Sequence, residues 1–226
     1  MELKAELQAP APWELSARGY ILVLKLPRER VERDCFLPTE LQGAQAGGLA
    51  YVMFVEYLQS PVGAYHELLL IPSAFRVGDR KRWSITKIYV SSQASVDHGR
   101  RNWGIPKELA AFDVQYGDQE RVDRIAIAVD GQPAVELTLR RHPFGVPLIG
   151  GLFPAGMRTL CQELAGSRFS FAPSARGSLR LGKLLSATID PRFFPVFGPA
   201  EVIGVAHVPA MQMTFPVAEI EPAGSV

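Results

Sequence analysis

The segment Arg124-Ile-Ala-Ile-Ala-Val-Asp-Gly-Gln-Pro-Ala-Val-Glu-Leu-Thr-Leu139 decides the fold class of this chain. Two short runs of apolar and branched residues flank Asp130-Gly131, a dipeptide typical of a two-residue hairpin turn. Pro133 has no amide hydrogen for a sheet ladder, so we expect the second strand to begin one residue later, at Ala134. The segment therefore predicts two antiparallel strands that are neighbours in sequence and in space.

Short runs of the same kind, bounded by Gly, Pro or Ser, recur along the whole chain. They predict strands at Tyr20–Leu26, Tyr51–Tyr57, Tyr65–Ile71, Trp83–Val90, Arg168–Phe171, Leu184–Asp190, Val202–His207 and Met211–Val217. Helices are predicted only at Pro27–Phe36 and Met157–Leu164. Because no helix of crossover length separates the strands, we expect a mainly β, antiparallel fold with few short helices. No linker stands out, so residues 1–226 are interpreted as a single domain.

Composition excludes several classes of function. The 24 basic residues are balanced by 23 acidic ones, which argues against a nucleic-acid or anionic-membrane partner. No apolar run is long enough to span a bilayer. The two cysteines have no ligand or disulfide spacing, and the four histidines are scattered, so we expect no metal site and a reducing, cytoplasmic location. Glycine-rich nucleotide loops and the common hydrolase motifs are also missing from the sequence.

One segment has an unusual composition: His98-Gly-Arg-Arg-Asn-Trp-Gly-Ile-Pro-Lys-Glu-Leu-Ala110. Lys107 follows Pro106, whose ring fixes the backbone, so a rigid turn presents the lysine. Walls made by Trp103, Ile105 and Leu109 would shield the ammonium from water and favour its neutral form. The alternative is an exposed turn with no catalytic role. In either case a turn lysine packs little, and we expect its replacement by alanine to cost at most about 1 kcal/mol of stability.

Three segments in the same order resemble the acetoacetate decarboxylase family. They are Arg18-Gly-Tyr-Ile-Leu-Val-Leu24 with Phe36-Leu-Pro38 and Leu41, then Gly63-Ala-Tyr-His-Glu67, and finally Gly99-Arg100 with Pro106-Lys107 and Leu109. The resemblance covers roughly Trp13 to Leu109. It implies an antiparallel β-barrel or cone with few short helices, and a homo-oligomer.

Carried over residue by residue, the resemblance makes Lys107 the Schiff-base lysine and Glu67 a catalytic carboxylate of the same pocket. Arg18 matches an arginine that lines the cavity and binds the substrate. Glu56 is the second residue that the resemblance implies to bind the substrate. It is the nearest match to another family glutamate and fits only with a slip of one residue, which in a strand moves a side chain to the other face.

Position 108 departs from the family pattern. The decarboxylases usually carry a second lysine where this chain has Glu108. A carboxylate within a few ångströms would favour the charged form of Lys107 and oppose its activation. Either Glu108 points out of the pocket, or Lys107 is not strongly activated.

These residues predict a lyase-like enzyme that forms a Schiff base with a small keto acid. The first hypothesis is decarboxylation of a β-keto acid such as acetoacetate, in which the iminium is the electron sink and no cofactor is needed. An alternative keeps the Schiff base but catalyses aldol or dehydration chemistry on a keto acid. A third possibility is a barrel that only binds a small ligand.

Overall fold

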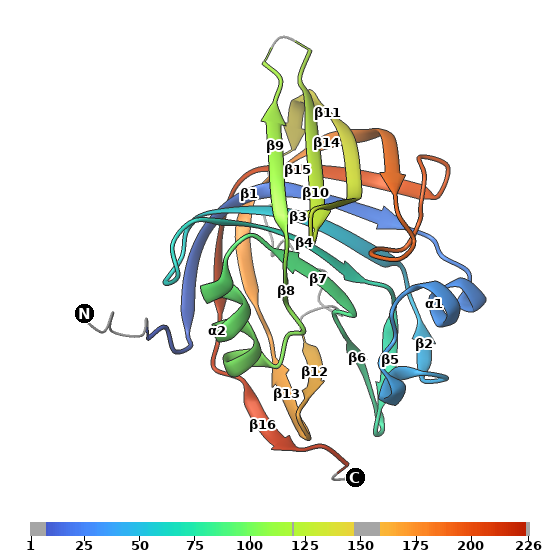
Figure 1. Ribbon diagram of the computed structural model, residues 1–226, viewed down its shortest axis with the longest axis vertical. Coiled ribbons are helices and arrows are strands. Elements are labelled where there is room, and N and C mark those ends of the chain that lie inside the picture. The colour runs from blue at the N-terminus through green and yellow to red at the C-terminus, as the bar shows by residue number, and fades with distance from the viewer. Residues whose placement is uncertain (1–7, 119, 147–158, 225–226) are drawn as a thin grey trace.

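In the computed structural model, which describes residues 8–118, 120–146 and 159–224, the chain folds into two β-sheets (Figure 1). The larger sheet has ten strands in the order β8-β7-β4-β3-β1-β15-β14-β11-β10-β9. Their bounds are β1 Trp13–Leu24, β3 Ala50–Gln59, β4 Tyr65–Ile71, β7 Lys87–Val90, β8 Glu108–Leu109, β9 Ala111–Tyr116, β10 Val122–Val129, β11 Gln132–Val146, β14 Ser174–Ile189 and β15 Val202–Phe215.

The smaller sheet has six strands in the order β16-β13-β12-β6-β5-β2. Their bounds are β2 Gln45–Gly47, β5 Ala74–Val77, β6 Arg80–Trp83, β12 Leu160–Leu164, β13 Ser167–Phe171 and β16 Glu219–Pro222. The helices are α1 Arg28–Asp34, the single turn η1 Thr39–Leu41, and α2 Gln93–Trp103. Pairing is antiparallel except between β7 and β8 and between β6 and β12.

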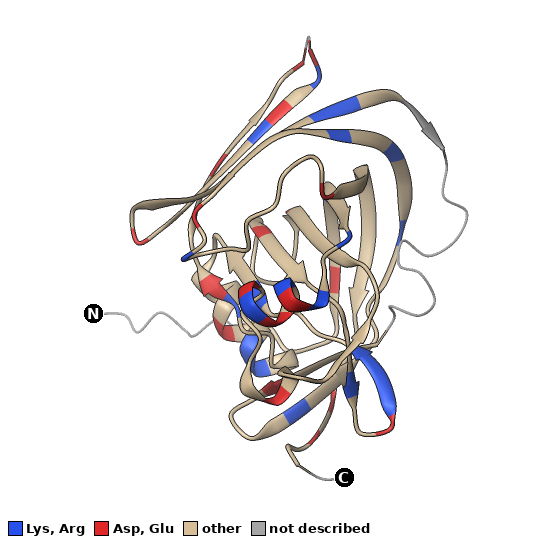
Figure 2. Cartoon of the chain, turned by 90° about the vertical axis from the view of Figure 1, so that its right-hand side faces the viewer, with Lys and Arg blue, Asp and Glu red and all other residues tan. Residues whose placement is uncertain are grey.

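The ten-stranded sheet curls into a nearly closed barrel. Its two edge strands, β8 and β9, are separated in the chain only by Ala110, so the chain itself brings the edges together. Figure 2 shows the long strands arching over the rest of the sheet. The predicted fold class, a mainly antiparallel β-barrel or cone with few short helices, is therefore confirmed.

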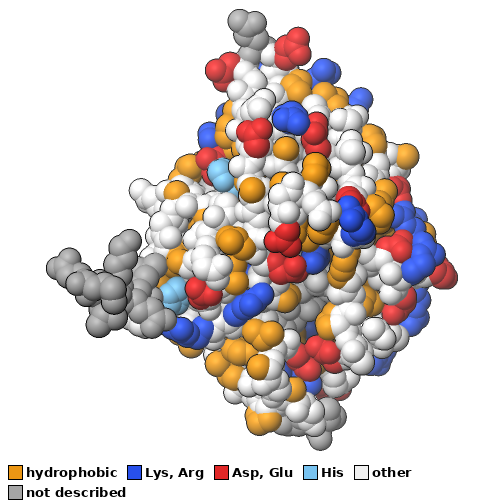
Figure 3. All heavy atoms as spheres, viewed as in Figure 1, with side chains coloured by type: hydrophobic (Ala, Val, Ile, Leu, Met, Phe, Trp, Pro, Cys, Tyr) orange, Lys and Arg blue, Asp and Glu red, His pale blue; other side chains and the backbone are white. Residues whose placement is uncertain are grey.

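Two hydrophobic cores lie on opposite faces of this sheet, as strand alternation requires. Along β1, Trp13, Leu15 and Ala17 belong to the core beneath the smaller sheet and α2, whereas Tyr20 and Leu22 belong to the core inside the barrel. The buried odd-numbered and even-numbered residues of β1 therefore belong to different hydrophobic cores. The outer surface carries charges of both signs interspersed with apolar side chains on the face shown in Figure 3.

The predicted hairpin is confirmed: β10 and β11 pair across Asp130 and Gly131, whose φ angles of 50° and 76° are those of the expected turn. The second strand begins at Gln132 rather than at Ala134, because the register shifts between Ile127 and Ala128 and accommodates the proline. The strand predicted at Tyr65–Ile71 is β4 with the same bounds.

Other predictions need correction. The run Trp83–Val90 is not one strand: β6 ends at Trp83 in the smaller sheet, and β7 begins at Lys87 in the larger one. The helix expected at Met157–Leu164 is wrong over Leu160–Leu164, which form β12 beside β13, while positions 157 and 158 lie outside the described residues. The two strands predicted between Val202 and Val217 are the single strand β15.

Helix α2 was not predicted, although its two ends are encoded locally. The Ser92 side chain accepts a hydrogen bond from the Ser95 amide at the start, and Gly104 ends the helix at φ 61°. The predicted helix at Pro27–Phe36 is confirmed as α1, with Pro27 one position before the first helical residue. Within the described ranges, no helix has the length and apolar character needed to cross a membrane.

Candidate active site

Lys107 lies in the short connection between α2 and β8. The helix ends with backbone bonds from Gly104 to Arg100 and from Ile105 to Gly99, and the Lys107 amide then donates to the Ile105 carbonyl at 2.8 Å. This tight turn around Pro106 directs the lysine inward, and only 4 % of Lys107 is exposed. The alternative of an exposed turn lysine is therefore wrong.

The aliphatic stem of Lys107 packs directly on α2 at Gly99. A Cβ atom at position 99 would lie 2.6 Å from Cδ and 2.8 Å from Cε of the lysine, closer than any side chain tolerates. Glycine is therefore the residue that lets the helix backbone approach the lysine. Gly99, one residue of the Gly99-Arg100 motif, therefore has a steric role.

The Lys107 ammonium is held by three polar neighbours. Nζ donates to Glu67 Oε2 at 2.8 Å and to Ser95 Oγ at 3.0 Å, and it lies 5.2 Å from the centre of the Tyr65 ring. The other carboxylate oxygen, Glu67 Oε1, accepts from the Tyr57 hydroxyl at 3.1 Å. Glu67 is 3 % exposed, so a charged pair is buried here and held on both sides.

Two small adjoining spaces, which we call the inner cavities, surround this pair. Their volumes are about 20 and 40 Å³, and five residues line both: Tyr57, Glu67, Leu69, Ile85 and Phe215. Lys107 itself lines the smaller one. The remaining walls are apolar, and Trp103 and Ile105 contribute as expected, whereas Leu109 is half-exposed and does not. Each cavity is large enough for one or a few water molecules only.

The electrostatics of the pair differ from the expected activation. Burial lowers the pKa of Lys107, but the Glu67 carboxylate and the Tyr65 hydroxyl raise it by a larger amount, and the net pKa is raised. Glu67 and Tyr65 therefore favour the charged form of Lys107. The carboxylate that raises the Lys107 pKa is Glu67, and Glu108 is not among the groups that act on it.

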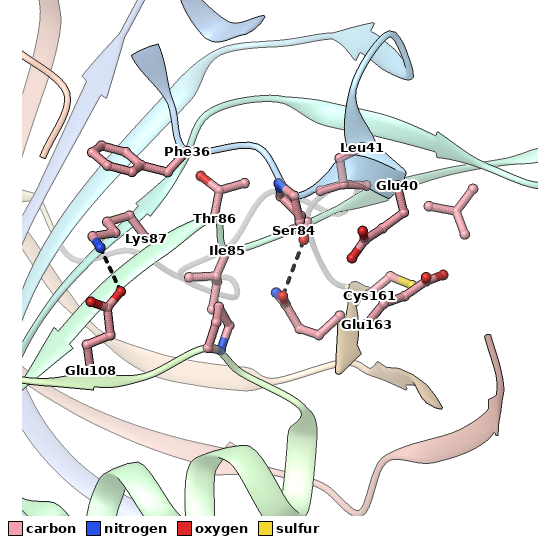
Figure 4. Close-up of a pocket in the computed structure, with 14 residues that line it drawn as sticks. Phe36, Glu40, Leu41, Ser84, Ile85, Thr86, Lys87, Glu108, Cys161 and Glu163 are labelled. Atoms are coloured by element: carbon pink, nitrogen blue, oxygen red, sulfur yellow. Dashed lines mark hydrogen bonds and ion pairs between the residues drawn. The ribbon is translucent and has the colours of Figure 1, made fainter. Parts of the chain in front are cut away.

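Glu108, the first residue of β8, points away from Lys107. Its carboxylate binds Lys87 Nζ at 2.6 Å at one end of a separate pocket, and 42 % of its side chain is exposed (Figure 4). Of the two possibilities left open by the sequence, the structure supports the one in which Glu108 lies outside the lysine pocket.

Arg18 and Glu56 are brought together by the structure, but not with Lys107. They face each other across β1 and β3, with Arg18 Nε 2.6 Å from Glu56 Oε2, and the guanidinium covers the Tyr116 ring at 4.2 Å. Val55, not Glu56, is paired with Glu67 on the neighbouring strand, so Glu56 lies on the barrel-side face. The expectation that Arg18 and Glu56 line the Lys107 cavity therefore needs correction, and the reason is strand alternation.

Three contact residues of the site were missed by sequence reasoning. Tyr65 stands two positions before Glu67, so strand alternation already places it on the carboxylate's face. Tyr57 is the cross-strand neighbour of Tyr65 on β3. Ser95 precedes Gly99 by four residues, one helical turn, and would follow from recognising α2. In the described part of the chain, no group of three His, Cys, Asp or Glu residues is placed to hold a metal ion.

A family model for acetoacetate decarboxylase (ADC) matches residues 8–143, which is more than half of the chain. No curated protein is significantly similar in sequence. Solved structures share the fold. One is acetoacetate decarboxylase from Legionella pneumophila (TM-score 0.71, 11% identity), and the match covers 98% of this chain and 91% of the Legionella chain. Another is an acetoacetate decarboxylase-like enzyme from Sphingomonas wittichii RW1 (TM-score 0.70, 17% identity), and the match covers 98% of this chain and 97% of that enzyme's chain.

The enduracididine biosynthesis enzyme MppR, complexed with the condensation product of pyruvate and imidazole 4-carboxaldehyde, is also similar (TM-score 0.68, 17% identity). It covers 98% of this chain with 94% of its own. Identities this low establish a common fold only, and the family assignment depends on the sequence match, which includes Lys107 and Glu67. By that match, this chain belongs to the acetoacetate decarboxylase family.

Proposed function

We propose that this protein is a Schiff-base-forming enzyme that acts on a small keto acid, with Lys107 as the nucleophile and Glu67 as its proton acceptor. One observation carries the proposal: a fully buried lysine lies 2.8 Å from a fully buried carboxylate, inside cavities with mainly apolar walls. An enclosed lysine with a specific carboxylate partner is typical of catalytic sites.

The first step is transfer of a proton from Nζ to Glu67. In a poorly solvated site a neutral amine beside a neutral carboxylic acid competes with the ion pair, because burial disfavours both charges. The free amine then attacks the ketone carbon and forms a C–N bond. Loss of water from the carbinolamine, with a proton returned by Glu67, gives the iminium. The electron sink is thus made from the protein and the substrate, and this scheme needs no cofactor.

Decarboxylation of a β-keto acid such as acetoacetate is the first reaction that the site favours. The C–C bond to the carboxylate breaks, its electron pair moves through the enamine towards nitrogen, and carbon dioxide leaves. Among the described residues that line the inner cavities, Lys107 is the one cation, so the substrate carboxylate meets apolar walls rather than a stabilising partner. Protonation of the enamine carbon and hydrolysis then release the ketone and the lysine.

Aldol-type condensation is the second candidate, and the position of Glu67 favours it. Once the iminium has formed, the carboxylate is close enough to take a proton from the carbon next to it and so produce the enamine that attacks an aldehyde. MppR, which shares the fold, has been determined with pyruvate and with a condensation product of pyruvate. Loss of water after condensation would complete a dehydration.

Borohydride trapping tests the proposal. We expect pyruvate or acetoacetate with borohydride to attach a reduced adduct to the Lys107 peptide, and Lys107→Met to show none. If no adduct forms with the wild type, the chain is a ligand-binding barrel instead. The two reactions are separated by carbon dioxide release from acetoacetate and by deuterium exchange into the pyruvate methyl group. Glu67→Gln should lower the Lys107 pKa, extend trapping to lower pH, and abolish the exchange.

The family resemblance further implies a homo-oligomer, and the two unpaired cysteines favour a cytoplasmic location; we include both in the proposal. Four large apolar side chains that are more than half exposed are compatible with subunit contacts. They lie on β14, on β15, just before β16 and on β16: Leu181, Ile203, Val217 and Ile220. Light scattering of the purified protein would test the oligomer directly.

A further inference from the structure

A larger pocket lies outside the lysine site, and we call it the outer pocket. It has a volume of about 300 Å³, five or more times that of either inner cavity (Figure 4). It is bounded by the loop after α1, the segment between β6 and β7, and strand β12. Pro106 and Glu108, the two chain neighbours of Lys107, also line it. The outer pocket therefore reaches the backbone that carries the lysine.

Among the described residues, Ile85 is the one that lines the outer pocket and both inner cavities. It is 4 % exposed and lies in the short segment that passes from β6 in one sheet to β7 in the other. Ile85 thus stands between the outer pocket and the cavities that hold Lys107 and Glu67. A keto acid is larger than either inner cavity, so a wall has to move before the substrate can bind, and Ile85 is the wall residue that also faces the outer pocket.

The backbone at this wall is held firmly, whereas the side chain is held only by packing. Thr86 is fixed by its amide to the Leu70 carbonyl at 3.1 Å and by its hydroxyl to the Cys35 carbonyl at 2.7 Å. In the orientation that satisfies its surroundings, the Gln162 amide accepts from the Ile85 amide at 2.7 Å and donates to the Ile85 carbonyl at 3.1 Å. Rotation of the isoleucine side chain would break none of these bonds.

We propose that Ile85 is the gate of the Lys107 site and that the outer pocket is the approach through which the carbonyl substrate arrives. The identity of the substrate as a keto acid rests on the proposed function, but the route does not. Gln162 is a positioning residue, because its side-chain amide is hydrogen-bonded to the backbone of Ile85 and holds that backbone in place while the Ile85 side chain rotates. Rotamer changes of this kind are fast, and the gate sets how often a small carbonyl compound meets the lysine.

Reductive methylation tests the route without requiring enzymatic activity. Formaldehyde with cyanoborohydride methylates any accessible amine, and peptide mass spectrometry gives the rate at Lys107 relative to the exposed Lys81. We expect Ile85→Ala to raise this ratio by about tenfold, the change expected when an access barrier falls by about 1.4 kcal/mol. Ile88→Ala is the matched control, because Ile88 is also buried and lines the lysine cavity but not the outer pocket.

An equal acceleration in Ile85→Ala and Ile88→Ala would overturn the gate, since it would indicate general loosening around the lysine. No acceleration in Ile85→Ala would overturn it as well. If the alanine variant does not fold, Ile85→Val should give a smaller increase and Ile85→Phe a decrease. Pyruvate trapping on the same variants separates the two proposals. A raised methylation ratio without any pyruvate adduct contradicts the keto-acid function alone, and equal trapping in all variants contradicts the gate alone.

Discussion

Gly99→Ala is the substitution that most directly tests how helix α2 positions the reactive amine. The added Cβ would lie 2.6 Å from Lys107 Cδ, whereas ordinary contacts begin at 3.4 Å, so the lysine stem has to retreat by about 0.8 Å. The stem has little freedom, because Pro106 fixes the turn and Nζ is bound to Glu67 and Ser95 at 2.8 and 3.0 Å. Both hydrogen bonds should lengthen or break.

The expected consequence is a fall of about 10- to 100-fold in the rate of pyruvate trapping, the usual effect of misplacing a reacting group by about 1 Å. Stability should change much less. Alanine gains about 1 kcal/mol of helix propensity over glycine, and this gain offsets part of the 1–3 kcal/mol that overpacking costs, by rough estimate. Trapping kinetics and urea unfolding, measured on the same preparation, separate the two effects.

Gly198→Ala is the matched control, because a Cβ at that position meets nothing within 4 Å and the residue is absent from the cavity walls. It should leave trapping unchanged. If Gly99→Ala traps pyruvate at the wild-type rate while remaining folded, α2 does not position the lysine, and the steric account of Gly99 is refuted.

Three further predictions concern charged and titratable groups. Lys107→Ala should lower the free energy of unfolding, measured in urea, by about 3–5 kcal/mol, because Glu67 is left buried without its partner. This loss is larger than the value of about 1 kcal/mol expected from the sequence. The double variant Lys107→Met with Glu67→Gln should recover most of the lost stability. Glu108→Gln removes the ion pair between Lys87, whose side chain is 12 % exposed, and Glu108, whose side chain is 42 % exposed, and should cost about 1 kcal/mol. A shifted pH midpoint of trapping would contradict the outward orientation of Glu108. Burial lowers the pKa of His207 to about 4, so as the pH falls the unfolded chain takes up a proton at this residue before the folded chain does. The free energy of unfolding should therefore fall as the pH drops from about 6.5 towards 4. His207→Gln should flatten that part of a plot of urea midpoint against pH.

Much of the fold could be predicted from the sequence because its strands are short, apolar and bounded by turn residues. The Asp130-Gly131 hairpin and β4 follow from local signals alone. The run Trp83–Val90 could not be divided correctly, since both parts alternate well and only long-range pairing assigns them to different sheets. Helix α2 was missed because its polar, glycine-containing sequence has a weak apolar stripe, even though its caps were present.

The candidate site could be predicted only in part, and the division follows strand geometry. Lys107 and Glu67 were placed together by their motifs, and the structure brings them within hydrogen-bond distance. Arg18 and Glu56 match the family pattern in order along the chain, but order does not decide which face of a strand a residue occupies. The raised pKa of Lys107 depends on a partner 40 residues away, which no local pattern around the lysine reveals.

The pairing of β1 with β15 has a consequence for how the protein is made. Trp13 and Phe215 are direct partners in that pairing, and both are walls of the cavity that holds Lys107. A ribosome that has synthesised only the first half of the chain has made the lysine but not the far wall of its enclosure. Until β15 docks, the Lys107 amine faces water on the side where Phe215 will later lie. The last long strand therefore completes the enclosure of the lysine, and a chain that ends before β15 has the Lys107 side chain but not its closed site.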